Sequence, residues 1–92
     1  MIDGNLYNEL THEEEFGKII IKIKDLLEDR KLSKTKLSFK AEIQRSQVIK
    51  YCNQSVTRID LAVLTRLCHA LNCKVEDILE YIPPEAIERK EI

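Results

Sequence analysis

The chain has 92 residues, which is too short for more than one domain. With 43% apolar and 34% charged residues, it is too apolar to be a disordered chain. The longest aliphatic run, Ile19 to Ile21, is far shorter than the roughly 20 apolar residues of a membrane span, so we expect no membrane partner. The acidic N-terminus lacks the basic-then-apolar order of a secretory signal, which predicts a cytoplasmic location. Three cysteines without a histidine cluster predict reduced thiols and no metal site.

The net charge of −1 conceals an uneven distribution along the chain. Residues 31–58 carry seven Lys and Arg side chains against Glu42 alone, a net charge of +6, whereas residues 1–17 have −5 and residues 59–92 have −3. A basic middle third can form a basic face on a protein that is nearly neutral overall. Nucleic acid is therefore a candidate partner.

Glycine and proline occur only near the ends of the chain, at Gly4, Gly17, Pro83 and Pro84. The intervening chain is therefore expected to consist of short helices joined by turns that use Ser, Asn and Asp. We expect an acidic leader at residues 1–17, a folded domain at 18–82, and a tail at 83–92 that contributes to a dimer contact.

The first three helices are predicted from apolar spacing and capping residues. Ile20, Ile23 and Leu27 lie at helical spacing and predict an amphipathic helix that ends near Arg30. Ser33 can cap a second helix over residues 34–41. A third helix is expected over about 44–52, with Val48 and Tyr51 facing inward.

Asp60 can cap a fourth helix that ends at Asn72. Its expected apolar stripe comprises Leu61, Leu64, Leu67, Cys68 and Leu71. A short fifth helix should add Val75, Ile78 and Leu79 to the same core. The flanks, residues 18–21 and 79–82, are rich in β-branched or aromatic residues and can pair as a two-stranded ribbon.

Residues 34–53 have the pattern of a helix-turn-helix. Two short helices can cross steeply when a small residue, here Ser38, lies where they meet and apolar residues close the corner. Those apolar residues are Leu37, Ala41, Ile43, Val48 and Tyr51. The turn carries Glu42 where a glycine is usual, so we expect a strained or slightly different turn.

Ile21 to Ile82 resembles the Cro/CI-type (XRE family) helix-turn-helix transcriptional regulators. The matching segments are KIKDLLEDRKLSKTKL, Ile43 to Asn53, and RIDLAVLTRLCHALNCKVEDILEYIP. Gln54 departs from this family pattern, which commonly has glycine there. The resemblance implies an all-α, compact five-helix, lambda-repressor-like domain that binds an operator in double-stranded DNA as a homodimer, most simply as a repressor, without a cofactor.

The resemblance also implies that the third helix contacts bases and that its neighbours hold phosphates. The residues expected at base edges are Gln44, Arg45, Ser46, Ile49 and Lys50. Those expected at phosphates are Ser33, Lys34, Asn53, Ser55, Thr57 and Arg58. Arg45 can pair bidentately with guanine, Gln44 with adenine, and Ile49 can contact a thymine methyl group.

Several features have a plainer interpretation. We expect Cys68 to pack as a small apolar residue, with redox sensing or metal binding as the alternative, and His69 to lie on the surface, while Cys52 and Cys73 have no evident partner. Phe39 is either an exposed aromatic residue or a contact between segments or subunits. The leader is either loosely structured or packs on the domain through its apolar residues.

No catalytic constellation is evident, so we expect no enzyme activity. The competing hypothesis is a protein-binding helix-turn-helix module, such as an antitoxin or an inhibitor of a partner protein.

Overall fold

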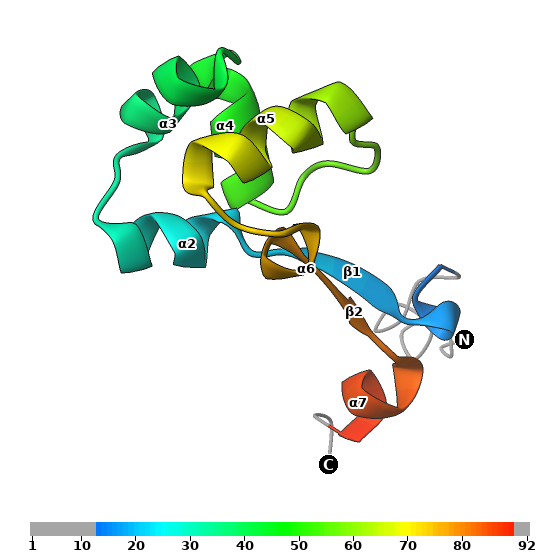
Figure 1. Ribbon diagram of the computed structural model, residues 1–92. Helices are drawn as coiled ribbons and strands as arrows, with labels where there is room; N and C mark the ends of the chain where they lie inside the picture. Colours follow the sequence, from blue (N-terminus) through cyan, green and yellow to red (C-terminus); the bar gives the residue numbers. More distant parts are fainter. Residues whose placement is uncertain (1–12, 90–92) are drawn as a thin grey trace. The chain divides into compact units, whose positions relative to one another are not determined.

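The computed structural model describes residues 13–89 and shows a mostly helical protein with one short sheet (Figure 1). One compact unit, Ile21–Glu80, contains most of the helices. They are α2 (Ile23–Arg30), α3 (Lys34–Ala41), α4 (Arg45–Cys52), α5 (Leu61–Leu71) and α6 (Val75–Ile78). A second unit comprises the two ends of the described chain, with the 3-10 helix η1 (Glu13–Phe16) and α7 (Pro84–Arg89).

The two strands are β1 (Lys18–Ile21) and β2 (Leu79–Ile82), which pair as a two-stranded antiparallel sheet. This confirms the predicted ribbon and its boundaries. Ile20 therefore lies in a strand, and its expected place in the first helix was wrong, since α2 begins only at Ile23. A run of three isoleucines favours extended backbone because β-branched side chains restrict the helical rotamers.

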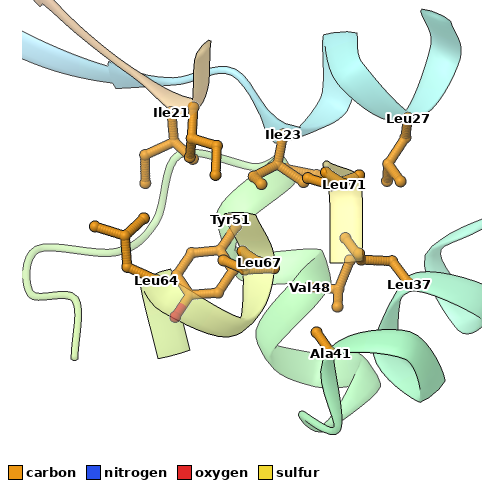
Figure 2. Packing of buried hydrophobic residues seen from close by; sticks show 12 residues of the cluster. Ile21, Ile23, Leu27, Leu37, Ala41, Val48, Tyr51, Leu64, Leu67 and Leu71 are labelled. Atoms are coloured by element: carbon orange, nitrogen blue, oxygen red, sulfur yellow. The ribbon is translucent and has the colours of Figure 1, made fainter. Parts of the chain in front are cut away.

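The core of the helical unit receives side chains from all five of its helices. Figure 2 shows isoleucine, leucine, valine and tyrosine side chains of α2, α3, α4 and α5 converging on one cluster, to which α6 contributes Ile78. The largest of the fully buried side chains are Ile23, Leu37, Val48, Leu67, Leu71 and Ile78, each exposed by 2% or less. Each such side chain stabilises the fold by about 1.5–3 kcal/mol relative to an exposed position.

Two helices begin at the capping residues that were predicted. The Ser33 hydroxyl accepts a hydrogen bond from the Lys36 amide at 3.0 Å, and the Asp60 carboxylate accepts one from the Ala62 amide at 2.7 Å. Each side chain satisfies an amide that the first helical turn leaves without a partner. These local bonds explain why α3 and α5 begin within one residue of their expected positions.

Four helices end in the same turn, and none of these turns contains glycine. Lys31, Glu42, Gln54 and Asn72 adopt left-handed backbone conformations with φ between 50° and 60°. In each turn the next residue donates its amide to the carbonyl five residues earlier, in the pairs Leu32 to Leu27, Ile43 to Ser38, Ser55 to Lys50, and Cys73 to Cys68. A left-handed non-glycine residue costs about 1–2 kcal/mol, so the strain expected at Glu42 is confirmed.

Gln54 has a contact that glycine could not make. Its side-chain amide oxygen accepts a hydrogen bond from the Ile21 amide at 2.9 Å, and its Nε2 donates to the Ile21 carbonyl. The side chain thus pairs with both polar groups of the last β1 residue and ties it to the end of α4. These bonds offset the cost of the left-handed backbone and explain the departure from glycine.

The structure corrects three further expectations. The described residues contain six α-helices rather than five, because α7 forms in the segment expected to be a tail. Leu61 is 75% exposed, since it begins α5 at a point where the apolar stripe extends beyond the core. Val75 is 47% exposed because α6 makes a single turn in which only Ile78 is fully buried.

The terminal unit depends on one glycine. Gly17 is buried with φ +98°, and a Cβ atom there would lie 2.8 Å from Cε1 of Tyr81 and against the Ile82 carbonyl oxygen. The Tyr81 hydroxyl donates a hydrogen bond to the Phe16 carbonyl at 2.8 Å. Gly17 therefore allows its backbone to lie against Tyr81 and Ile82, a position that a side chain at residue 17 would block.

Parts of two expectations lie outside the described residues. Of the acidic leader, the structure describes only η1 and Gly17, and the other apolar residues of the leader lie outside the described part of the chain. The side chain of Ile87, expected at a dimer contact, is likewise outside the described set. No helix in the described part of the chain has the length and apolarity that a membrane span requires.

Candidate nucleic-acid interface

The crossing of α3 and α4 is built around a small residue, as predicted. Ser38 is 8% exposed, and its hydroxyl donates to the Thr35 carbonyl at 2.6 Å, which satisfies its polar group. The left-handed Glu42 then reverses the chain, and the Ile43 amide bonds back to Ser38. Because the hydroxyl is satisfied within its own helix, the corner is compact without an unpaired buried group.

Helix α4 has a buried face and a polar face. Val48, Tyr51 and Cys52 are buried, and Figure 2 shows Val48 and Tyr51 in the core cluster. The residues expected to contact bases lie on the other faces: Gln44, Arg45, Ser46 and Lys50 are exposed, and Ile49 is half-buried. The structure therefore presents the predicted set together along one short helix.

The N-terminus of α4 is open compared with those of α3 and α5. Gln44 precedes the helix but makes no side-chain cap bond, and its side-chain oxygen instead lies 3.5 Å from the Ser46 hydroxyl. Gln44 thus provides no side-chain acceptor for the first amides of α4. Such a helix end carries a partial positive charge and favours an approaching anion.

Arg45 is held by a residue that the sequence interpretation missed. Its Nε donates a hydrogen bond to the Thr35 hydroxyl at 3.0 Å, so a side chain of α3 fixes the direction of the guanidinium. Within the described chain Arg45 makes no ion pair with a carboxylate. The two Nη groups thus keep their donors for a bidentate acceptor. The role of Thr35 becomes visible only in the tertiary structure, because α3 and α4 must pack together before the Thr35 hydroxyl can contact Arg45.

The residues expected at phosphates fall into two groups. Ser55, Thr57 and Arg58 line an open hollow of about 280 Å³ beside the end of α4, together with Lys50, which was expected at a base edge, and Gln47, which was not predicted. The Ser55 hydroxyl donates to the Lys50 carbonyl at 3.3 Å and helps to shape this loop. Asn53, also exposed, lies in the turn that leads into it.

Ser33 and Lys34 line a second hollow of about 470 Å³ at the start of α3. Its wall also contains Lys24 and Lys31, which were not predicted to act with DNA, and Glu28. Lys24 and Lys31 are seven residues apart, two helical turns, and this spacing was the signal available in the sequence. Three lysines against one glutamate make this hollow basic.

Buried groups beneath these surfaces remain neutral. Burial, and then the Asp60 carboxylate, raises the pKa of Tyr51 above its usual range. Burial also raises the pKa of Cys52, an effect that the Lys34 and Lys24 ammonium groups oppose. Both side chains therefore act as packing residues at neutral pH, and the charge of the surface comes from Lys and Arg.

Comparison with known proteins agrees with this arrangement. Residues 22–84 match the family model of the Cro/C1-type HTH DNA-binding domain. The chain belongs to this family. It is 40% identical over 63 residues to the uncharacterized HTH-type transcriptional regulator YozG of Bacillus subtilis (strain 168), a match that covers 68% of this chain and 75% of the relative. It is also similar to the crystal structure of the transcriptional regulator VanUg, with a TM-score of 0.60 and 29% identity, over 74% of this chain and 89% of that one.

The remaining side chains of this helix-turn-helix protein can now be placed. Phe39 is 77% exposed, so it lies on the surface of α3. Cys68 is half-buried against the core and His69 is exposed, as expected. Cys73, for which the sequence offered no partner, packs at the end of the same helix as Cys68.

Proposed function

We propose that this member of the Cro/C1-type HTH family is a sequence-specific transcriptional repressor that binds a palindromic operator as a homodimer. The observation that carries the proposal is the two-sided character of α4. One face is buried in the core, while Gln44, Arg45, Ser46 and Lys50 are exposed together beside an uncapped helix N-terminus. A reading helix needs this combination of rigid support and available donors.

Arg45 is proposed as the principal base-reading residue. Its bond to Thr35 restricts the guanidinium before DNA arrives, which lowers the entropy lost on binding. Gln44, Ser46, Ile49 and Lys50 complete the proposed base-contacting set. A guanidinium with free Nη donors matches the acceptor pair of guanine in the major groove.

The two hollows are proposed as phosphate contacts on either side of this helix. Ser33 and Lys34 serve one strand, with Lys24 and Lys31 adding charge. Asn53, Ser55, Thr57 and Arg58 serve the other strand, with the loop shaped by the bond from Ser55 to Lys50. Cationic contacts of this kind supply affinity that falls steeply with salt concentration.

Dimerisation follows from the size of the reading helix. The eight residues of α4 rise about 12 Å, enough for only a few base pairs, so one copy has little specificity. Two copies on half-sites about 34 Å apart would multiply both affinity and specificity. We place the dimer contact in residues 83–92 and the DNA-binding domain in residues 18–82. The protein is proposed to act in the cytoplasm by binding alone, without catalysis or a cofactor.

Selection of binding sites from a random pool of duplex DNA tests the proposal. The expected result is an enriched palindrome whose half-sites are one helical turn apart, bound with dimer mass in light scattering. Binding to the selected site should persist at salt concentrations that abolish binding to a scrambled duplex.

A protein that selects no sequence and loses all DNA at modest salt would contradict the proposal and favour the protein-binding alternative. Lys74→Ala is the control for the loss of one positive charge outside the proposed interface. Lys74 is exposed, and its hydrogen bond to Asp77 uses the backbone amide, which alanine retains. This variant should bind the selected site as well as the original chain does.

A further inference from the structure

The two cysteines at the end of α5 are held together by the turn that ends the helix. Asn72 adopts the left-handed conformation with φ 50°. The Asn72 amide donates to the His69 carbonyl at 3.2 Å, and the Cys73 amide donates to the Cys68 carbonyl at 3.0 Å. This pair of bonds brings the backbone of Cys73 back against the last turn of α5, beside Cys68.

The same geometry occurs at the end of α2, where the paired positions are Leu27 and Leu32. There both side chains are apolar and pack on the core. In α5 the equivalent positions carry Cys68 and Cys73, which also pack against the core. The turn is therefore a general feature of the fold, and the thiols at these positions are particular to α5.

The separation that this turn imposes is suited to a disulfide. A bond of 3.0 Å between the Cys73 amide nitrogen and the Cys68 carbonyl oxygen places their Cα atoms about 6 Å apart. A disulfide requires about 4.4–6.8 Å between Cα atoms. Both side chains are half-buried, so a small oxidant can reach them from solvent.

Nearby groups act on the Cys73 thiol in opposite directions. Burial raises the pKa of Cys73, and Cys68 is the next cause of that increase, followed by Asp77. Arg30 opposes the increase, and its Nε donates to the Leu71 carbonyl at 3.1 Å, which fixes a cation beside this turn. The increase outweighs the effect of Arg30, so the Cys73 thiol ionises less readily than a free thiol, and exchange through its thiolate should become faster as the pH rises.

We propose that Cys68 and Cys73 form a reversible intramolecular disulfide, which makes the end of α5 a redox-sensitive site. With oxidised glutathione as oxidant, the thiolate of one cysteine attacks a glutathione sulfur, forms a mixed disulfide and releases one glutathione. The thiolate of the other cysteine then attacks the protein sulfur of the mixed disulfide and releases the second glutathione. Each released glutathione thiolate takes up one of the two protons that the cysteines lose.

Cys52 provides an internal contrast. It is buried at the end of α4 with 7% exposure, and its neighbours in the hollow at the start of α3 are Lys24, Lys34 and other non-thiol residues. It should therefore remain reduced while the pair at the end of α5 oxidises. The site depends on the turn of α5 and does not require the proposed DNA-binding function.

The test is incubation of the full chain with oxidised glutathione, followed by mass spectrometry under non-reducing conditions and thiol counting after denaturation. We expect the loss of two thiols and two hydrogens, a monomeric chain, a peptide that links Cys68 to Cys73, and full reversal by dithiothreitol. The cross-link closes a loop of six residues in the unfolded chain, so the Tm should rise by roughly 8 to 16 °C on oxidation.

Cys68→Ala and Cys73→Ala should each prevent the two-thiol loss and the Tm increase, whereas Cys52→Ala should preserve both. If an alanine variant unfolds, alkylation of the original chain before oxidation serves the same purpose. A chain that retains three thiols, a lasting glutathione adduct, or a disulfide that involves Cys52 would overturn the proposal.

Discussion

Helices α4 and α5 have the same general design but differ at their N-termini and on their outer faces. Asp60 caps α5 by accepting the Ala62 amide, while α4 begins at Gln44 with no side-chain cap. Leu64, Leu67 and Leu71 make α5 the most apolar of the core helices. The outer face of α4 instead carries polar and basic side chains, and one of them, Arg45, donates a hydrogen bond to Thr35 of α3. The comparison shows that α5 mainly contributes apolar side chains to the core. Helix α4 contributes to the core with one face and leaves the polar side chains of its other face exposed for a binding partner.

The largest expected effect lies in the core part of α5. Leu67→Ala removes a side chain with no exposure and should lower the free energy of unfolding by about 2–5 kcal/mol, because it leaves a cavity. Leu61→Ala is the matched control in the same helix, since Leu61 is 75% exposed and should contribute little. Denaturant unfolding of both variants measures the difference. Equal losses would mean that α5 does not divide into a core part and an exposed end.

The next effect separates reading from electrostatic attraction at α4 and α3. Arg45→Ala should cost about 1–3 kcal/mol on the selected operator and reduce discrimination at one base pair in each half-site. Lys34→Ala should weaken binding to all duplexes alike and reduce the salt slope by about one unit. Fluorescence anisotropy on operator and scrambled DNA at several salt concentrations distinguishes them. If the two variants behave alike on both duplexes, α4 is not a reading helix.

A smaller effect contrasts the two helix N-termini directly. Asp60→Ala removes a cap and should lower the stability by about 0.5–2 kcal/mol. Gln44→Ala removes no cap bond, so its thermal transition should change little while operator affinity decreases. Calorimetry together with DNA titration measures both quantities. A stability loss for Gln44→Ala as large as that for Asp60→Ala would show that α4 is capped in solution.

The smallest effect concerns the two left-handed turns that flank α4. Glu42→Gly relieves a strained backbone and keeps the carbonyl that accepts from Arg66, so it should stabilise the protein by about 0.5–1 kcal/mol. Gln54→Gly relieves similar strain but loses both bonds to Ile21, so it should give no gain or a net loss. Urea midpoints of the two variants decide the matter, and an equal gain for both would contradict the role assigned to Gln54.

Much of the fold could be predicted from local patterns in the sequence. The caps at Ser33 and Asp60, the boundaries of the ribbon, and the small Ser38 at the helix crossing depend on residues close together in the chain. The inward positions of Val48 and Tyr51 follow from helical periodicity alone. The outward positions of Arg45, Ser46 and Lys50 follow from the same periodicity, whereas their assignment to bases, and that of the loop residues to phosphates, rested on the family resemblance.

Periodicity does not show where the core ends, and for that reason Leu61 and Val75 were assigned to it although both are exposed. The bond from Arg45 to Thr35 and the pairing of Gln54 with Ile21 join residues 10 and 33 positions apart, so they exist only after the helices have packed. The approach of the Cys73 backbone to Cys68 depends on the left-handed Asn72; the sequence predicted that the helix ends at Asn72 but did not predict this backbone conformation. The sequence by itself determined which residues form helices and which faces are apolar, because these are local properties. Only the tertiary structure decided which exposed side chains are held in place, because that depends on contacts between helices.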